Sequence, residues 1–182
     1  ATGSGTFTLE APATSTNRTL VLPDEAGTIL TTATAGVPIG GPAFYYWQSV
    51  QQTGVSANTT TKITLTSSVF DTTGGMFASS RFTPTVAGYY QLNFGVQIPY
   101  TSTNAGINSS VSKNNIAIIS GSGSNGGNSL YPDSAGSGLV YLNGSTDYVE
   151  LKIYGSQAGT SYNIQTGQER TFFSGVLVRS AT

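Results

Sequence analysis

A strict alternation of apolar and polar side chains at residues 90–98 constrains the fold more than any other feature of this sequence. The alternating side chains are Tyr90, Leu92, Phe94, Val96 and Ile98 on one side and Gln91, Asn93, Gly95 and Gln97 on the other. Successive side chains of a β-strand point to opposite faces, so this pattern is typical of a strand with one buried face. Residues 149–153 and 63–65 repeat it, and no window has the apolar spacing of an amphipathic helix. The sequence therefore predicts an all-β, antiparallel fold.

Turn-forming residues separate the predicted strands at short intervals. The turns expected from Gly and Pro content are residues 71–75 and 84–88. Residues 113–115, Lys-Asn-Asn, predict the tip of a hairpin, and Asn-Gly at residues 143–144 gives the strongest short-range hairpin signal. Residues 121–138 are rich in Gly, Ser and Asn and predict a long loop, which is either flexible or in contact with a partner.

The composition argues against several classes of function. The chain has no cysteine for disulfides or thiolate metal sites, and no histidine, which is the commonest general base and metal ligand. Seven basic and eight acidic residues give a net charge of −1, so no surface for duplex nucleic acid is expected. No run approaches the roughly 20 apolar residues that span a bilayer, so no membrane insertion is expected. A surface of neutral hydroxyls and amides suits a dense assembly of many copies.

The first 41 residues differ in kind from the rest. Short strand-like pieces at residues 7–9, 20–22 and 29–30 are separated by Pro and Gly. They contain too little apolar surface to form a core alone, so we expect this segment to be stable only when wound with, or packed on, other copies. The chain is therefore expected to have two parts: a short β stem for attachment at residues 1–41 and a head domain at residues 42–182.

Four segments of the larger part follow one another in the order met in a known family. Residues 42–46 read Pro-Ala-Phe-Tyr-Tyr, residues 81–90 Arg-Phe-Thr-Pro-Thr-Val-Ala-Gly-Tyr-Tyr, residues 112–114 Ser-Lys-Asn, and residues 171–177 Thr-Phe-Phe-Ser-Gly-Val-Leu. They resemble the opening strand, the Phe, Pro, Gly-x-Tyr signature, the Lys-Asn hairpin and the closing strand of the complement C-one-q and tumour necrosis factor heads. The resemblance implies an antiparallel jelly-roll sandwich and a homotrimer about a threefold axis.

The predicted closing strand is apolar on both faces. By alternation, Phe173 and Leu177 face one way. Phe172, Val176 and Val178 face the other way. A strand that is apolar on both faces must be covered on both. We expect the first face to pack on the partner sheet and the second to form the trimer interface. The alternative is a monomeric sandwich with this strand in its interior.

Two segments of the stem carry a second resemblance. Residues 6–12 read Thr-Phe-Thr-Leu-Glu-Ala-Pro, and residues 22–28 read Leu-Pro-Asp-Glu-Ala-Gly-Thr. They are similar to segments of bacteriophage tail-fibre and other virion proteins. This likeness implies a phage virion structural protein at the particle surface, a trimeric fibre or fibre tip that recognises the host surface and is held to other virion proteins by its stem. Two alternatives stay open: a capsid fibre, decoration or tail adaptor protein with a purely structural role, and a secreted complement-head-like binding protein.

The acidic residues do not form the arrangements that catalysis or metal binding needs. Asp147 and Glu150 are an odd step apart in a predicted strand, so we expect them on opposite faces, unable to act as a catalytic pair. Asp71, Asp133 and loop carbonyls could offer oxygen ligands to Ca²⁺, but no spaced acidic loop is present. We therefore expect a protein without enzyme activity, cofactor or metal site.

The long loop and one strand end carry the candidate ligand-binding side chains. Sugar recognition combines an aromatic ring with amides and carboxylates that bind hydroxyl groups. Tyr131 and Asp133 offer this pair, Asn125 and Asn128 lie near them in the sequence, and Tyr100 at a strand end is a further candidate. The alternative is that each tyrosine packs under its own loop. The expected partner is a glycan or protein of the host surface.

Overall fold

The computed structural model describes residues 41–99, 106–124, 131–156 and 161–181. These residues form strands and no helix, so the all-β prediction is confirmed. The strands are β1 (Ala43–Trp47), β2 (Gln52–Ser56), β3 (Thr61–Lys62), β4 (Ser67–Asp71), β5 (Phe77–Ala78), β6 (Arg81–Phe82), β7 (Gly88–Gln97), β8 (Gly106–Lys113), β9 (Ile116–Ser124), β10 (Asp133–Leu142), β11 (Val149–Ser156), β12 (Ser161–Ile164) and β13 (Phe172–Ser180). The predicted stem lies outside the described residues, apart from Gly41, and stays a prediction.

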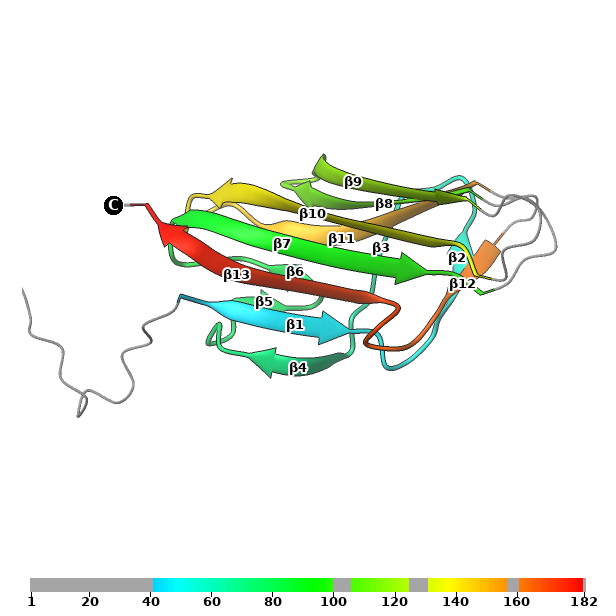
Figure 1. The fold of residues 1–182 in the computed structure, drawn as a ribbon, viewed down its shortest axis with the longest axis horizontal. Coiled ribbons are helices and arrows are strands. Elements are labelled where there is room, and N and C mark those ends of the chain that lie inside the picture. The colour runs from blue at the N-terminus through cyan, green and yellow to red at the C-terminus, as the bar shows by residue number, and fades with distance from the viewer. Residues whose placement is uncertain (1–40, 100–105, 125–130, 157–160, 182) are drawn as a thin grey trace, which may run out of the picture. The chain divides into compact units, whose positions relative to one another are not determined.

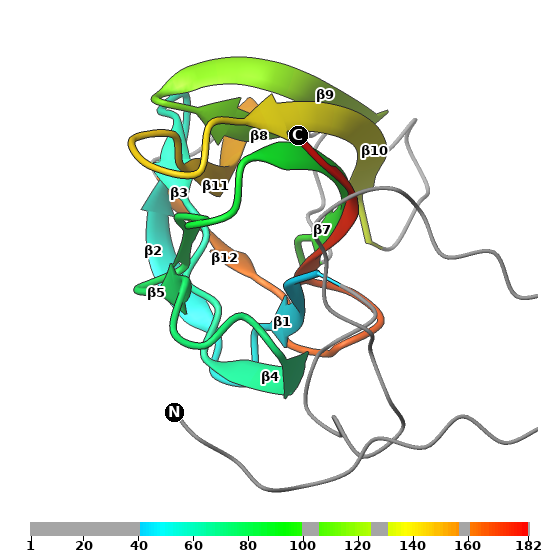
Figure 2. The same ribbon diagram turned by 90° about the vertical axis from the view of Figure 1, so that its left-hand side faces the viewer.

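The strands build an antiparallel sandwich. One sheet has the order β10-β7-β13-β1-β4, and the other has the order β5-β6-β11-β8-β9 with β3 paired to β11. A small third sheet joins β12 to β2. Figure 1 shows the first sheet in front of the second, and Figure 2 shows the two layers curving around the core. Of the described ladders between strands, all are antiparallel, as the sequence predicts. We call these two layers the first and the second sheet.

Strand β7 is an inner strand of the first sheet, beside the edge strand β10, and its apolar and polar side chains alternate as predicted. The five alternating apolar side chains of residues 90–98 are all buried. β7 pairs with β10 on one side and with β13 on the other, so both of its edges are hydrogen-bonded. Burying one face of a fully paired strand supplies much of the hydrophobic stabilisation of a sandwich.

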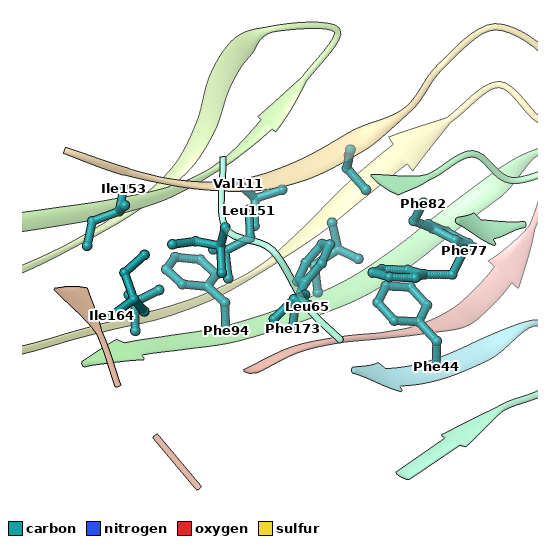
Figure 3. Packing of buried hydrophobic residues seen from close by; sticks show 14 of the residues in the cluster. Phe44, Leu65, Phe77, Phe82, Phe94, Val111, Leu151, Ile153, Ile164 and Phe173 are labelled. Carbon is teal, nitrogen blue, oxygen red and sulfur yellow. The ribbon is translucent and has the colours of Figure 1, made fainter. Parts of the chain in front are cut away.

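Aromatic rings fill the end of the core near β1, β5 and β6. Phe44 lies with its ring centroid 4.8 Å from Phe77, 4.7 Å from Phe82 and 5.3 Å from Phe173 (Figure 3). Gly175 stands opposite this ring, because a Cβ built there would lie 2.6 Å from Phe44 Cε1. In the Phe-Ser-Gly sequence of the closing strand, Phe173 therefore places its ring in the core, and Gly175 leaves room for the ring of Phe44.

The hairpin predicted at residues 113–115 is confirmed. β8 and β9 pair directly across it, and Asn114 and Asn115 have φ angles of 50° and 70°. Positive φ at both central residues is what a tight hairpin between twisted strands requires, and Asn tolerates it better than most residues.

The hairpin predicted at residues 143–144 is wrong, although a turn does lie there. β10 before it belongs to the first sheet and β11 after it to the second, so the connection crosses between layers. The Asn143 Oδ1 atom accepts hydrogen bonds from the backbone N–H groups of Ser145, Thr146 and Asp147, at 2.9–3.0 Å. This side-chain cap holds a six-residue crossover, a geometry that the Asn-Gly signal alone does not distinguish from a two-residue hairpin.

The long loop predicted at residues 121–138 is also corrected. β9 continues to Ser124 and β10 begins at Asp133, so most of this segment is strand. The glycines serve close packing between β9 and β10: a Cβ at Gly121 would collide with the Ala135 carbonyl, and one at Gly123 with the Asp133 carbonyl. A glycine-rich composition therefore marks a close approach of two strands here, as well as a loop.

Candidate assembly interface

The outer face of the first sheet, turned away from the core, carries large apolar side chains at positions where a soluble sheet usually carries polar ones. Cross-strand pairing brings them together from β1, β4, β7, β10 and β13. We call this set the apolar face: Tyr45, Phe70, Tyr89, Leu139, Tyr141, Phe172, Val176 and Val178. Soluble single subunits rarely expose apolar patches larger than a few hundred Å².

The closing strand β13 has the two faces that its sequence predicts. Phe173 is fully buried against the core, whereas 42% of Val176 and 61% of Val178 remain exposed. β13 lies in the middle of the first sheet, so its outer side is covered by nothing within the described part of the subunit except its neighbours on the same face. The predicted role of Phe172, Val176 and Val178 in a trimer interface stays a prediction.

Phe172 is half-buried because an aromatic neighbour covers it. The Tyr45 ring stacks on Phe172 with the centroids 5.3 Å apart and the planes 12° from parallel, and Phe70 lies 6.3 Å from Tyr45. The Tyr45 hydroxyl donates a 2.6 Å hydrogen bond to the Gln168 carbonyl, which fixes the ring. The apolar face is therefore preorganised at this end, and little side-chain entropy remains to be lost when a partner covers it.

A second aromatic group lies farther along the same face. The rings of Tyr89 and Tyr141 lie 5.4 Å apart across the β7–β10 ladder, and Leu139 is exposed one alternate position away from Tyr141. Gln91 and Asn93 lie between the two aromatic groups and are joined by a 3.3 Å hydrogen bond. Aromatic rings such as these are enriched in protein–protein interfaces.

Sequence reasoning found three members of this face and missed five. Tyr45 and Phe70 became neighbours only when β1 paired with β4, and Tyr89 met Tyr141 only when β7 paired with β10. Alternation within one strand assigns each side chain to a face, but it does not give the cross-strand register that makes a patch.

The candidate ligand residues that the structure describes lie at one end of the sandwich. Tyr131 and Asp133 are exposed beside the end of β7, where Asp133 pairs with Gln97. The Ile98 backbone N–H donates a 3.0 Å hydrogen bond to the Pro132 carbonyl, which fixes the backbone between them. The Tyr131 side chain is 46% exposed. Tyr100, Asn125 and Asn128 lie outside the described residues, and their predicted role stays a prediction.

The two carboxylates considered for catalysis are both engaged in ion pairs. Asp147 lies before β11 rather than within it, which corrects the expectation of two opposite faces of one strand. Its Oδ2 atom is 2.8 Å from Lys113 Nζ. Burial alone would raise the pKa of Asp147, but hydrogen bonds from Lys113, Asn114 and the Asn143 backbone outweigh it and lower that pKa. Its role is to hold the crossover to the second sheet.

Glu150 is nearly buried on the outer side of the second sheet and is surrounded by cations. Its carboxylate lies 2.9 Å from Arg81, 3.5 Å from Lys62 and 3.7 Å from Lys152. Burial would raise the pKa of Glu150, yet the hydrogen bond from Arg81 and the three positive charges lower it. Glu150 is therefore ionised at neutral pH, a poor proton donor for glycoside cleavage.

The two proposed calcium ligands do not meet. Asp71 lies at the end of β4 and accepts hydrogen bonds from the Tyr46 hydroxyl at 2.6 Å and from the Thr73 backbone at 2.7 Å. Asp133 lies at the start of β10. In the part of the chain that the structure covers, no three acidic side chains gather as metal ligands.

Comparisons with known proteins support the fold and go no further. No protein-family model matches the sequence, and no curated protein matches it. Among solved structures, murine APRIL at pH 8.5 is similar with a TM-score of 0.54 and 14% identity, over 75% of this chain and 98% of that one. The Eiger TNF structure from S. frugiperda is similar with a TM-score of 0.55 and 9% identity, over 79% of this chain and 96% of that one. The described head therefore has the tumour necrosis factor-like jelly-roll fold.

Proposed function

We propose that the chain forms a homotrimer through its apolar face and serves, without catalysis, as the head of a phage virion fibre that contacts the host surface. The apolar face is the single observation that carries the assembly. Its exposed aromatic and branched side chains lie on the sheet side that no other layer covers within the described residues. Three copies that shelter this face from water would gain the free energy that a lone subunit leaves unused.

The two ends of the head suggest which one faces the partner. The chain enters at Gly41, beside the end of β13, where the Leu177 N–H donates to the Pro42 carbonyl at 3.0 Å. Tyr131 and Asp133 lie at the other end of β7, a strand of ten residues that spans about 30 Å. Gly41 and Tyr131 therefore lie at opposite ends of the head, and we propose that the Tyr131 end is the one that contacts the host.

Support for the virion part comes from the N-terminal segments, which resemble phage tail-fibre proteins. A purely structural capsid fibre, decoration or tail adaptor is the second candidate, favoured by the apolar face alone, because assembly needs no ligand at the distal end. The likeness to APRIL and Eiger TNF fits a secreted binding head as well, since it concerns the fold only.

The decisive experiment has two steps. The first is the native mass of the full chain, for which we expect three chains per particle; a monomeric mass would overturn the proposal. The second is adsorption of virions whose protein carries Tyr131→Ala with Asp133→Ala, compared with virions that carry Arg179→Ala at the opposite end. We expect the Tyr131→Ala and Asp133→Ala double variant to reduce adsorption and the Arg179→Ala variant to leave it unchanged. A trimer with unimpaired adsorption would overturn host recognition and favour the structural role.

A further inference from the structure

A polar groove lies on the outer face of the second sheet, on the opposite side of the sandwich from the apolar face. Its volume is about 440 Å³, and its lining includes Asn108, Ser110, Ser112, Asn115, Lys152 and Tyr154. Pockets of about 300–1,000 Å³ are typical of small-molecule sites. The groove remains open to solvent when the apolar face is covered by other subunits, because the two lie on different sheets.

The register of β8 with β11 builds the floor of this groove. Tyr154 of β11 pairs with Asn108 of β8, and Lys152 pairs with Ser110, so alternate residues of both strands point outward together. The β8–β9 hairpin adds Asn115, whose Oδ1 atom accepts a 2.9 Å hydrogen bond from Lys152 Nζ. The cation is thereby held in place at the groove.

The hydroxyl groups of the floor have unused hydrogen-bonding capacity. Ser110 and Ser112 are only 8% and 3% exposed, yet neither hydroxyl has a hydrogen bond to any other described residue. Ser109, the residue between Ser110 and Asn108, points inward and its hydroxyl bonds to Ser134 Oγ at 2.6 Å. The inner hydroxyl is satisfied by protein, and the two outer hydroxyls are left for a ligand or solvent.

The charge around the groove is positive. Lys152 is the charged residue of the groove lining, and the neighbouring Glu150 carboxylate is also paired with Lys62 and Arg81, which lie outside the groove. Lys152 has three N–H donors: one bonds to Asn115 Oδ1, and the ammonium group also lies 3.7 Å from the Glu150 carboxylate, which leaves donor capacity for a ligand. It can therefore donate to an anionic group in the groove and gain a charge-assisted hydrogen bond.

Tyr154 provides the aromatic surface. Its side chain is 39% exposed, and its hydroxyl lies 3.5 Å from Asn58 Oδ1, which keeps the ring at the groove. A ring, amides, hydroxyls and one cation together match the groups of an acidic sugar: an apolar ring face, several hydroxyls and a carboxylate.

We propose that this groove binds a carboxylate-bearing sugar. Lys152 binds the carboxylate, the Ser110 and Ser112 hydroxyls and the Asn108 amide bind the sugar hydroxyls, and Tyr154 packs on the ring face. The inference concerns the single subunit and does not rest on the virion assignment. It is also separate from the distal end at Tyr131.

The test is a calorimetric titration of the full chain with three acidic probes: galacturonate, glucuronate and sialic-acid oligosaccharides, each beside a neutral oligosaccharide of equal length. We expect at least one acidic probe to bind about tenfold more tightly than its neutral counterpart, since hydrogen bonds to charged groups are stronger than neutral ones. Lys152→Gln and Tyr154→Ala should each weaken that binding about tenfold, in line with the loss of one strong contact. Arg170→Gln, an exposed cation elsewhere, and Tyr131→Ala should leave it unchanged.

Three outcomes would overturn the proposal. They are no binding of any acidic probe, equal binding of the neutral probes, and equal weakening by Arg170→Gln, which would indicate general charge attraction. Lys152→Gln removes the contact to Asn115 and could prevent folding, which a thermal melt would detect. In that case Tyr154→Ala alone tests the groove, because the Tyr154 ring is partly exposed and its loss should not prevent folding. If the chain binds the acidic sugar but has a monomeric native mass, the assembly proposal is wrong and the sugar-binding proposal is supported.

Discussion

Tyr45 and Phe172, 127 residues apart in the sequence, stack with ring centroids 5.3 Å apart and interplanar angle 12° on the outer face of the first sheet. Adjacent pairing of β1 with β13 makes this contact, since Trp47 pairs with Phe172 and Tyr45 with Ser174. Stacked rings on a solvent-facing sheet surface define a rigid apolar platform. The assembly proposal depends on that platform.

A charge placed on the apolar face should separate the subunits. Val176→Asp would bury an unpaired carboxylate between copies, which costs about 3–5 kcal/mol for a charge without a partner. We expect the native mass to fall from three chains to one while the far-ultraviolet circular dichroism spectrum stays unchanged. Ile116→Asp is the matched control, because Ile116 is 71% exposed on the second sheet. Loss of the trimer in both variants would contradict the assignment of the interface.

A methyl group at the glycine of the closing strand should destabilise the core. The Cβ of Gly175→Ala would lie 2.6 Å from Phe44 Cε1 and 2.8 Å from Leu92 Cδ2, so rings and backbone must shift. Overpacking of this kind costs about 1–3 kcal/mol of unfolding free energy. Urea unfolding measures it, with Ser174→Ala on the outer side of the same strand as the control. Equal stability of the two variants would mean that the core yields more easily than its packing indicates.

Removal of the Asn143 cap should destabilise the crossover between the sheets. Asn143→Ala leaves the backbone N–H groups of residues 145–147 without their shared acceptor. The Ser145 and Thr146 N–H groups are exposed and can bond to water, and only the Asp147 N–H is partly buried, so we expect a loss of about 1 kcal/mol. Thermal or urea unfolding checks this. Ser145→Ala, an exposed position in the same turn, should have little effect, and a similar loss in that control would point to a general sensitivity of the turn.

Stability should fall in acid because of two ion-paired carboxylates. The folded-state pKa values of Asp147 and Glu150 lie below their ordinary values of 3.8 and 4.5. A group with a lowered folded pKa stabilises the fold above its unfolded pKa, and this stabilisation is lost as the pH falls through the folded value. We therefore expect constant stability from these groups above about pH 5 and a decline below pH 4.5.

The contribution of the Glu150 carboxylate to the loss of stability in acid can be measured by substitution. Glu150→Gln should make the unfolding free energy less dependent on pH below pH 4.5, in urea titrations repeated at several pH values. Glu169→Gln is the control, because Glu169 is exposed and its ion pair is with the exposed Arg170. An unchanged acid slope in Glu150→Gln would show that other carboxylates cause the decline.

By itself, the sequence determined which side chains point inward. The alternation of residues 90–98 and the two apolar sides of the closing strand depend only on the two-residue period of a strand, which is a local property. The Lys-Asn-Asn hairpin is also a local property, because its turn residues stand directly between two strand-like segments.

Only the tertiary structure decided which strands pair and in what register. The cap at Asn143 is local, but the turn joins two different sheets, because β10 pairs with β7 and β11 pairs with β8. The Asp147–Lys113 ion pair across this crossover likewise joins residues far apart in the chain. The meeting of Tyr45 with Phe172, and the groove between β8 and β11, likewise depend on cross-strand register. Register follows from the packing of the whole core, and no single segment contains that information.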